Sequence, residues 1–376
     1  MMPLLALVPV AIWLYLLVGR GFFWVMAERD DKDDPPAPAA WPCVVAVVPA
    51  RNEADVVARS IGSLLAQDYP GDFRIVLVDD QSGDGTADIA RALGASDRLD
   101  VVTGAPRPAG WAGKVWAMKQ GAARAGTPDY IWFTDADIEH APDNLRRLMA
   151  RAESGKLVLA SLMVKLHCTS WAEAYLIPAF VLFFAMLYPF RRVNDPKNRT
   201  AAAAGGCMLI RRDALKRAGG VDAIRGEIID DCAMGRALKG QGPIWLGLTE
   251  RAHSIRPYAG LAEIRGMVVR SAYAQLGYSP LALFGTILGM VIVYGAAPIF
   301  ALFGREGAQA SGVLAWLAMA FAFQPILKFY RASPLWGLAM PLIGFVYTVF
   351  TFDSAVQYWS GRGGMWKGRA QALKTP

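Results

Sequence analysis

Residues 43–55 read CVVAVVPARNEAD, an uninterrupted apolar run that passes directly into a charged segment. A short continuous apolar run is typical of a strand buried on both faces of a sheet. Beyond the charged segment, Val56, Ile61 and Leu64 recur at helical spacing, so the charged residues fall in a loop between strand and helix. The stretch therefore predicts the first strand–loop–helix unit of an α/β domain.

The same order of apolar run and polar loop returns twice further along the chain. Residues 74–78, RIVLV, run into DDQSGDGT, where Thr86 is the predicted N-cap of the next helix. Residues 130–133, YIWF, run into TDAD, and a weaker strand is predicted at 101–103. This alternation predicts right-handed βαβ units and a Rossmann-like, mostly parallel sheet with flanking helices. Such sheets bind ligands at the carboxyl ends of their strands, where these polar loops fall.

Apolar segments at both ends of the chain predict membrane attachment. Residues 3–19 carry no charge and are nearly long enough to span a bilayer, which takes roughly 20 residues. Three further apolar blocks lie at 281–303, 312–328 and 334–352. Lys and Arg flank these blocks, and the net charge is +7. The positive-inside rule and attraction to anionic lipid explain this charge, so we expect a membrane and no nucleic acid among the partners.

The chain is thus predicted to have six consecutive parts. They are an N-terminal transmembrane anchor at 1–26, a linker at 27–40, the α/β domain at 41–258, a juxtamembrane amphipathic segment at 259–280, a bundle of about three transmembrane segments at 281–358, and a basic tail at 359–376. Three full spans after one anchor would place the tail across the membrane from the α/β domain. Either one block is therefore re-entrant or interfacial, or the tail breaks the positive-inside rule.

Residues 172–190, inside the α/β domain, are continuously apolar and rich in aromatic residues. A core helix is one reading of this stretch. We expect instead an interfacial segment that dips into the membrane and brings the active site to the bilayer surface.

Several classes of site are not supported. No GxGxxG follows the first strand and no GxxxxGK[ST] occurs, so dinucleotide and P-loop sites lose their main support. The four cysteines form no CxxC pair, which fits reduced thiols rather than a zinc site or a disulfide scaffold. The three histidines lack HExxH spacing and are predicted to be structural.

Asp135 and Asp137 follow the strand at 130–133 and are the first candidate site residues. Pro142 predicts the start of the next helix with its cap at about Ala141, so Asp137 comes too early to cap it. Two carboxylates one residue apart offer the hard oxygens that Mg²⁺ or Mn²⁺ prefers. The pair therefore predicts a metal and diphosphate site.

Two other loops carry candidate ligand-binding residues. Asp79 and Asp80 end a buried strand, where adjacent carboxylates repel unless a ligand or another donor compensates. In the first loop, Asn52 is explained as a helix N-cap, which leaves Arg51 and Glu53 to bind a ligand.

A lysine and a glycine pair add further candidates. Lys114 follows Gly110 and Gly113 and is a predicted phosphate contact. Gly205 and Gly206 precede an apolar strand, where glycine either bulges the strand or lets a ligand approach the backbone.

A helix predicted within 226–238 carries Glu227, Asp230 and Asp231 in or near its first turn. The helix dipole is a sufficient explanation for one or two of these acids. A catalytic base, however, needs a carboxylate held beside an acceptor hydroxyl, and a helix start would hold it well.

These motifs together resemble a known family. VVPARNEAD, VDDQSGDGT, TDAD, AGGCMLIRR and IDDCAMGRAL follow the order and spacing of family 2 glycosyltransferases with a GT-A fold. Nearly the whole chain is similar to the hopene-associated glycosyltransferases of bacterial hopanoid gene clusters, in passages such as AFAFQPILKFYRASPLWGLA and GRGGMWKGR. The resemblance implies an inverting hexosyl- or N-acetylhexosaminyl-transferase that uses a nucleotide-diphosphate sugar and Mg²⁺ or Mn²⁺. It implies a multi-pass protein of the bacterial inner (cytoplasmic) membrane, with the catalytic domain facing the cytoplasm and a polyprenol or hopanoid-type lipid as acceptor.

The resemblance also assigns roles to residues. The nucleotide-sugar pocket would contain Ala50, Arg51, Glu53, Asp79, Asp80 and Asp135, to which we add Lys114. Asp135 and Asp137 would bind the metal ion and the diphosphate. Asp231 would be the catalytic base, with Asp230 standing where the family has Glu.

The acceptor site departs from the family pattern. We assign Gly205, Gly206 and Arg270 to this site. Many membrane members carry Gln-x-x-Arg-Trp before their membrane helices, whereas residues 267–271 here read MVVRS. The missing Trp argues against a processive polysaccharide synthase. Two alternatives stay open: a non-catalytic membrane scaffold, and a nucleotidyltransferase, whose Gly-rich signature followed by Lys is absent from VVPARNEAD.

Overall fold

The chain folds into two compact units. The computed structural model describes residues 2–94, 97–365 and 367–368. One unit, here called the sheet unit, contains 28–167 and 192–257, and the other, the helical unit, contains the described residues of 1–27, 168–191 and 258–376.

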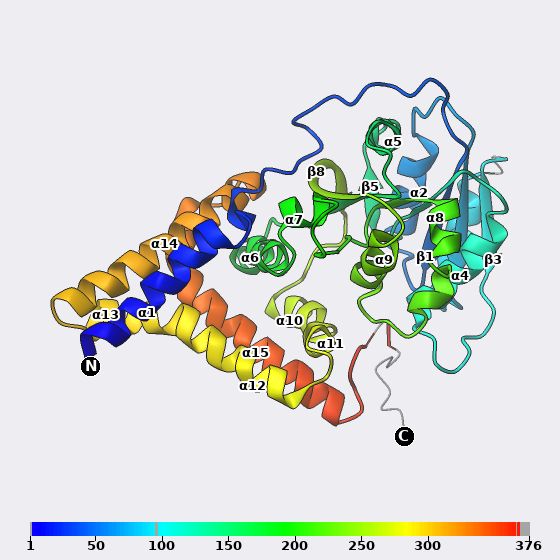
Figure 1. Cartoon of the computed structure of the whole chain (residues 1–376). Coiled ribbons are helices and arrows are strands. Elements are labelled where there is room, and N and C mark those ends of the chain that lie inside the picture. Colours follow the sequence, from blue (N-terminus) through cyan, green and yellow to red (C-terminus); the bar gives the residue numbers. More distant parts are fainter. Residues whose placement is uncertain (1, 95–96, 366, 369–376) are drawn as a thin grey trace. The chain divides into compact units, whose positions relative to one another are not determined.

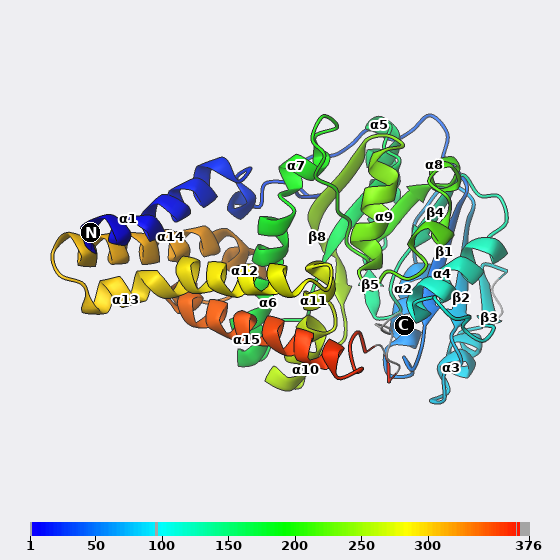
Figure 2. The same ribbon diagram turned by 60° about the horizontal axis from the view of Figure 1, so that its bottom comes forward.

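The described part of the sheet unit contains one eight-stranded sheet in the order β3-β2-β1-β4-β7-β6-β8-β5 (Figure 1, Figure 2). The strands are β1 (Val44–Ala50), β2 (Phe73–Asp79), β3 (Leu99–Thr103), β4 (Tyr130–Phe133), β5 (Ile138–His140), β6 (Leu159–Lys165), β7 (Met208–Arg211) and β8 (Ile244–Ser254). Strands β3, β2, β1 and β4 run parallel, as do β6 and β8, whereas β7 and β5 are antiparallel to their neighbours. The predicted α/β fold with a mostly parallel Rossmann-like sheet is confirmed.

Helices cover both faces of this sheet. They are α2 (Val57–Leu65), α3 (Thr86–Ala92), α4 (Gly113–Arg124), α5 (Asn144–Ser154), α8 (Arg212–Arg217) and α9 (Asp230–Lys239), with the short η3 (Val221–Ile224) between the last two. The short α7 (Phe190–Asn194) contains the point at which the chain passes from one unit to the other. Val44, Ala46 and Val48 of β1 pack in one core with residues of α2 and α5. On the other face, α4 approaches β1 so closely at Gly121 that an added Cβ would lie 2.3 Å from Cγ1 of Val47. This contact holds α4 against the sheet.

The helical unit is built from apolar helices. They are α1 (Met2–Leu14), η1 (Tyr15–Gly19), η2 (Phe23–Val25), α6 (Trp171–Leu187), α10 (Leu261–Val269), α11 (Ala272–Gln275), α12 (Pro280–Met290), η4 (Val291–Gly295), α13 (Ala296–Phe303), α14 (Gly307–Tyr330), η5 (Pro334–Ala339) and α15 (Met340–Trp359). Among the described residues, three stretches are long and apolar enough to cross a membrane: Pro280–Phe303, Gly307–Tyr330 and Pro334–Trp359. The three predicted C-terminal apolar segments are therefore present as helices that could span a membrane.

Two shorter apolar stretches also belong to the helical unit. Ala6–Gly19 lies in the predicted anchor, and helix α1 runs along α14 in both views (Figure 1, Figure 2). Helix α6 starts at a capping box formed by Ser170 and Glu173, and Tyr347 of α15 donates a hydrogen bond to the carbonyl oxygen of Leu176 at 2.9 Å. The interfacial position of 172–190 stays a prediction. The end of the basic tail, 369–376, lies outside the described residues.

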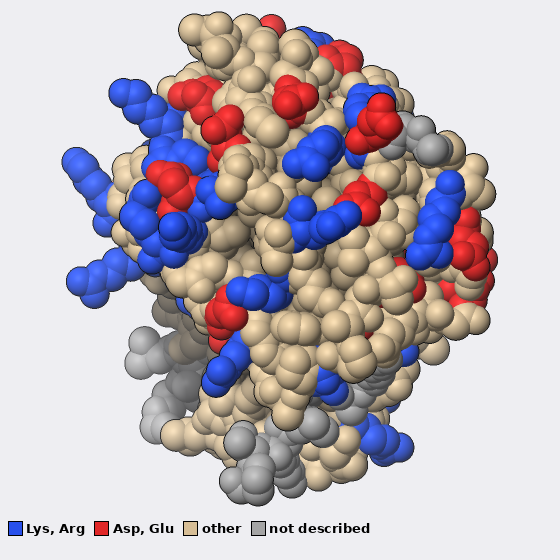
Figure 3. Space-filling view, turned by 90° about the vertical axis from the view of Figure 1, so that its right-hand side faces the viewer, with Lys and Arg blue, Asp and Glu red and all other residues tan. Residues whose placement is uncertain are grey.

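Charges of both signs are interspersed on the face of the protein that Figure 3 presents. Figure 3 shows Asp and Glu side chains lying between Lys and Arg side chains over the face it presents. The sheet unit contains many such ion pairs, for example Arg124 with Asp100 at 2.5 Å and Arg146 with Asp68 at 3.1 Å. On this face the Lys and Arg side chains do not form one continuous positive patch.

Candidate active site

The ammonium group of Lys114 joins three segments of the sheet unit. Its Nζ lies 2.8 Å from Oδ1 of Asp135, after β4, and 3.2 Å from Oδ2 of Asp230, the first residue of α9. Lys114 itself is in the first turn of α4. Burial opposes its charge, but the two carboxylates outweigh burial and raise the pKa of Lys114. The lysine therefore stays protonated at neutral pH.

Asp231 is a half-buried carboxylate beside this lysine. Its Oδ2 accepts a hydrogen bond from the backbone N–H of Gly205 at 3.0 Å, and its Oδ1 accepts one from that of Cys232 at 2.7 Å. Burial, followed by the neighbouring charge of Asp230, raises the pKa of Asp231 to about 6. A carboxylate with a pKa near neutrality is well matched to general base catalysis.

The two glycines before β7 have different reasons to be glycine. A Cβ on Gly205 would lie 3.0 Å from Nζ of Lys114 and 3.5 Å from Cβ of Asp231, so its absence leaves room for both side chains. A Cβ on Gly206 would lie 2.8 Å from Cγ2 of Val164, so this glycine allows the chain to pack on β6. Gly205 thus shapes the site, whereas Gly206 is a packing residue.

The negative charges of Asp79 and Asp80, at the end of β2, are partly compensated by other groups of the protein. The guanidinium of Arg51 donates to the carbonyl oxygens of Asp80 and Gln81 and lies 3.7 Å from Oδ2 of the fully buried Asp80. Oδ2 of Asp79 accepts from the N–H of Ser82 at 3.3 Å. Oδ1 of Asp79 is buried and has no hydrogen-bond partner among the described residues, a state that a ligand donor would relieve.

The predicted capping role of Asn52 is wrong. Asn52 has a left-handed backbone with φ of 50°, and its Oδ1 accepts from the N–H of Gly83 at 3.0 Å. Helix α2 begins later, at Val57. The side chain is used to join the loops after β1 and β2, and this tertiary contact outweighs the local capping pattern.

Thr86 is also not the N-cap of its helix, because it is the first residue of α3 and follows Gly85 in the capping position. Its Oγ1 accepts a hydrogen bond from the N–H of Glu53 at 2.8 Å. Like Asn52, it serves to hold the two loops together.

Arg256 is a site residue that the sequence did not reveal. It follows β8, and its guanidinium pairs with the carboxylate of buried Glu53 and with Oδ2 of Asp137, which lies 3.4 Å from Nε. The N–H of Ile255 donates to the carbonyl oxygen of Asp137 at 2.9 Å. The segment after β8 is therefore attached to the loop after β4 through both main chain and side chain. No motif or spacing around Arg256 marks this role.

The region after Asp137 differs from the prediction. Residues Ile138–His140 form β5 on the edge of the sheet, and α5 begins at Asn144 with Asp143, not Ala141, in the capping position. Pairing with β8 keeps these residues extended, which delays the helix. Asp137 is thus even further from any capping position.

The acid pair after β4 fits a divalent cation in chemistry. Asp135 and Asp137 supply hard carboxylate oxygens, and the phosphates of a ligand would complete such a site. Both acids face cations of the chain, Lys114 and Arg256 respectively. Among the described residues there is no group of three or more His, Cys, Asp or Glu side chains arranged for a metal ion.

The remaining predicted residues lie at two places. Ala50 ends β1, is fully buried, and its carbonyl oxygen accepts from the N–H of Asp80 at 2.8 Å, so it acts through its backbone. Arg270 caps the end of α10 in the helical unit and is exposed. Its acceptor role stays a prediction.

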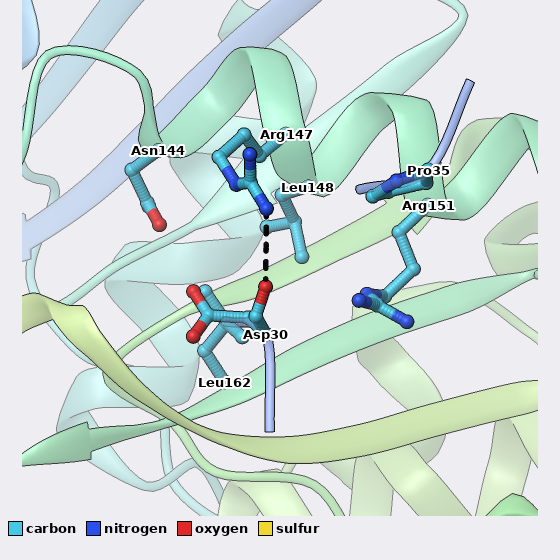
Figure 4. A pocket seen from close by; sticks show the side chains of 7 residues that line it. All are labelled: Asp30, Pro35, Asn144, Arg147, Leu148, Arg151 and Leu162. Carbon is cyan, nitrogen blue, oxygen red and sulfur yellow. Dashed lines mark hydrogen bonds between the residues drawn. The ribbon is translucent and has the colours of Figure 1, made fainter. Parts of the chain in front are cut away.

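A second cluster of ion pairs joins α5 to the predicted linker. Residues 28–34, here called the acidic strap, belong to the predicted linker, and Figure 4 shows Asp30 of this segment facing Arg147 of α5. Arg147 lies 2.6 Å from Oδ1 of Asp34 and donates to the carbonyl oxygen of Asp30 at 3.4 Å, the bond drawn in Figure 4. Arg151 pairs with Asp33. This part of the linker is therefore bound to the sheet unit.

The sheet unit matches a known family in sequence. Residues 45–219 match the sequence model of Glycosyl transferase family 2. A 4,4'-diaponeurosporenoate glycosyltransferase of Staphylococcus aureus (strain bovine RF122 / ET3-1) is 38% identical over 92 residues, which are 24% of this chain and 23% of that protein. An N-acetylglucosaminyltransferase of Mesorhizobium japonicum is 25% identical over 186 residues, 48% of this chain and 42% of that protein. The chain thus spans less than half the length of either relative.

A solved structure shares the fold. The mannosyltransferase of Pyrobaculum calidifontis, in complex with GDP-Man and Mn²⁺, superposes with a TM-score of 0.56 at 20% identity. The superposition covers 98% of this chain and 100% of that chain.

Proposed function

We propose that this chain, in which residues 45–219 form a glycosyltransferase family 2 domain, is an inverting, metal-dependent glycosyltransferase. It moves a sugar from a nucleotide-diphosphate donor to a lipid hydroxyl at a membrane surface. The observation that carries the proposal is Asp231, whose pKa of about 6 suits a base and which lies beside a lysine paired with two further acids.

The reaction is a single in-line displacement. Asp231 takes the proton from the acceptor hydroxyl, whose oxygen forms a bond to the anomeric carbon. The bond from that carbon to the diphosphate oxygen breaks on the opposite face, which inverts the configuration. The charge of Lys114 is already in place for the negative charge that develops on the leaving diphosphate.

Asp135 and Asp137 would hold the cation, Mg²⁺ or Mn²⁺, which when bound supplies further positive charge to the leaving diphosphate. The donor set of two hard carboxylates supports this assignment, as does the Mn²⁺ in the structure of the mannosyltransferase. For the cation to bind, the contacts of these acids with Lys114 and Arg256 must be shared or exchanged.

The loops after β1 and β2 would bind the nucleotide. Arg51 and Glu53 line this edge, and the buried Oδ1 of Asp79 would accept a hydrogen bond from a base imide N–H or a ribose hydroxyl. Asp80 is held by Arg51 and would fix the shape of the loop.

The proposed acceptor is a polyprenol or hopanoid-type lipid. Three apolar helical stretches that could span a membrane support a lipid substrate, and the S. aureus relative is named for 4,4'-diaponeurosporenoate. The hopanoid option rests on the resemblance of the whole chain. Gly205, whose N–H holds the carboxylate of Asp231, is the proposed acceptor-side residue of the sheet unit. Arg270, in the helical unit, is proposed separately as a contact for the lipid. The protein would be a multi-pass protein of the bacterial inner membrane, with the sheet unit facing the cytoplasm.

The test is mass spectrometry of lipids in membranes with and without the full chain, supplied with a panel of nucleotide sugars and Mn²⁺. We expect a new glycolipid with one donor, in the anomeric configuration opposite to that of the donor. Retention of configuration would contradict the single displacement. If nucleotide diphosphates bind but no donor gives a product, the chain is the non-catalytic scaffold. Release of pyrophosphate from an added nucleoside triphosphate and sugar 1-phosphate would identify a nucleotidyltransferase.

A further inference from the structure

A buried polar network begins beside the site acids in the chain, at the residue before Asp135. Its side chains come from β4 and the residue after it, β5, the start of α5 and the residue before β7, and each is at most 3% exposed. They are Trp132, Thr134, His140, Asn144 and Cys207. Buried polar groups persist in a fold when they are hydrogen-bonded to one another, and such a network then favours one arrangement of the segments.

The hydrogen bonds of this network run in one direction. Nδ2 of Asn144 lies 3.1 Å from Nδ1 of His140, and an amide NH₂ can only donate, so Nδ1 carries no proton. Burial lowers the pKa of His140 to about 3, so the ring is neutral and its proton is on Nε2. Nε2 donates to Oγ1 of Thr134 at 2.8 Å. Thr134 in turn donates to the carbonyl oxygen of Gly206 at 2.8 Å.

Both ends of this chain of bonds adjoin residues of the site. Thr134 directly precedes Asp135, on the side of the leaving group. Gly206 directly follows Gly205, whose N–H holds the carboxylate of Asp231. One threonine hydroxyl therefore connects the loop that carries the metal and diphosphate acids to the loop that orients the base.

We propose that Thr134 and His140 are positioning residues that fix the separation between Asp135 and Asp231. The inference rests on the proposed function, because an in-line displacement needs the base and the leaving-group side on opposite faces of one carbon. Small errors in such an alignment are costly, and a misplacement of about 1 Å can lower a rate about a hundredfold. The network would thus affect turnover without touching the substrate.

The test uses Thr134→Val, which removes the hydroxyl at nearly constant shape, and Thr134→Ser, which keeps it. In the full chain in detergent, hydrogen exchange of the peptide that covers Gly205 and Gly206 should be about fivefold faster in Thr134→Val, as expected for the loss of one hydrogen bond. In membranes, its kcat should fall about ten- to a hundredfold while the KM for the donor stays unchanged. Thr134→Ser should behave as wild type in both measurements.

A matched control is Thr249→Val, another buried threonine, whose hydroxyl donates to Asp30 of the acidic strap at 2.6 Å. It should lower the melting temperature and leave kcat and the exchange of the Gly205 peptide unchanged. If Thr134→Val fails to fold, Asn144→Ala removes the first donor of the chain of bonds and should give the same pattern with smaller changes.

The positioning role of Thr134 and the proposed glycosyltransferase function can be contradicted by different results. If the wild type transfers sugar and Thr134→Val keeps the wild-type kcat or the wild-type exchange rate, the positioning role is wrong and the proposed function stands. If Thr134→Ser is as impaired as Thr134→Val, the hydroxyl is not the link and the positioning role is again wrong. If the wild type transfers no sugar from any donor, both proposals fall.

Discussion

Two arginines near the end of the sheet unit, Arg251 and Arg256, each bridge two carboxylates, but only one of these bridges lies at the candidate site. Arg251 of β8 lies 3.4 Å from a carboxylate oxygen of Asp30 and 3.1 Å from one of Asp143, and so joins the acidic strap to the start of α5. Arg256 joins Glu53 and Asp137 in the same bridging manner. Only the second pair lies in the loops after β1 and β4, at the carboxyl edge of the parallel strands, where ligands of such sheets bind.

The number of paired acids therefore does not distinguish a site from a structural clamp. The acidic strap is also rich in aspartate, and its exposed Asp31, Asp33 and Asp34 each pair with one arginine. In the site, acids from several loops converge, and one of them, Asp231, has a pKa raised to about 6. Convergence at strand ends marks the functional cluster, whereas a raised pKa alone does not, because burial also raises the pKa of Asp30 in the acidic strap.

The largest expected effect is that of Asp231→Asn. Without a base, kcat should fall by about a hundredfold or more, whereas binding of GDP or UDP with Mn²⁺, measured by calorimetry, should be unchanged. Asp33→Asn in the acidic strap is the matched control and should keep the wild-type kcat. Near wild-type transfer by Asp231→Asn would show that the base is elsewhere.

The pH dependence should follow the same carboxylate. Asp231 accepts a proton only when ionised, and its raised pKa means that the ionised form is lost as the pH falls below about 6. The value of kcat/KM should therefore fall about tenfold for each pH unit below 6 and be level above it. His140 does not enter this limb, because burial lowers its pKa to about 3. A limb centred near pH 4 would contradict the assignment.

Replacing Arg256 or Arg251 with glutamine tests whether only the first of these arginines contributes to ligand binding. Arg256→Gln should weaken Mn²⁺-dependent binding of a nucleotide diphosphate about tenfold, because Glu53 and Asp137 lose the group that orients them. Arg251→Gln should leave that affinity unchanged and lower the free energy of unfolding by about 1–3 kcal/mol, because buried Asp30 loses a partner. If both variants change only stability, Arg256 is another structural clamp.

The smallest effect is expected for Asp34→Asn in the acidic strap. Its carboxylate is mostly exposed, so loss of the pair with Arg147 should lower the free energy of unfolding by less than about 1 kcal/mol, and less still in high salt. Chemical denaturation at two salt concentrations measures this change. A larger loss would mean that the strap contributes more to the fold than its exposed ion pairs suggest.

Much of the sheet could be predicted from local patterns. The apolar runs at 43–49, 74–78 and 130–133 became β1, β2 and β4, because a strand buried on both faces is apolar over consecutive residues. Strand β5 was missed because it is three residues long and forms only by pairing with β8, more than a hundred residues away. Asn52 was misassigned for a similar reason, since its partner Gly83 lies 31 residues further along the chain.

In the candidate site, too, some features could be predicted from local sequence patterns and others depend on contacts between distant residues. By itself the sequence determined the fold class, the strand ends at which Asp79 and Asp135 lie and the helix start that carries Asp231, because strand and helix periodicity are properties of neighbouring residues. Only the tertiary structure decided which groups meet: Arg256 reaches Glu53 across 203 residues, and Thr134 reaches Gly206 across 72. Such contacts depend on how the strands are ordered in space, which leaves no mark on the residues next to Arg256 or Thr134.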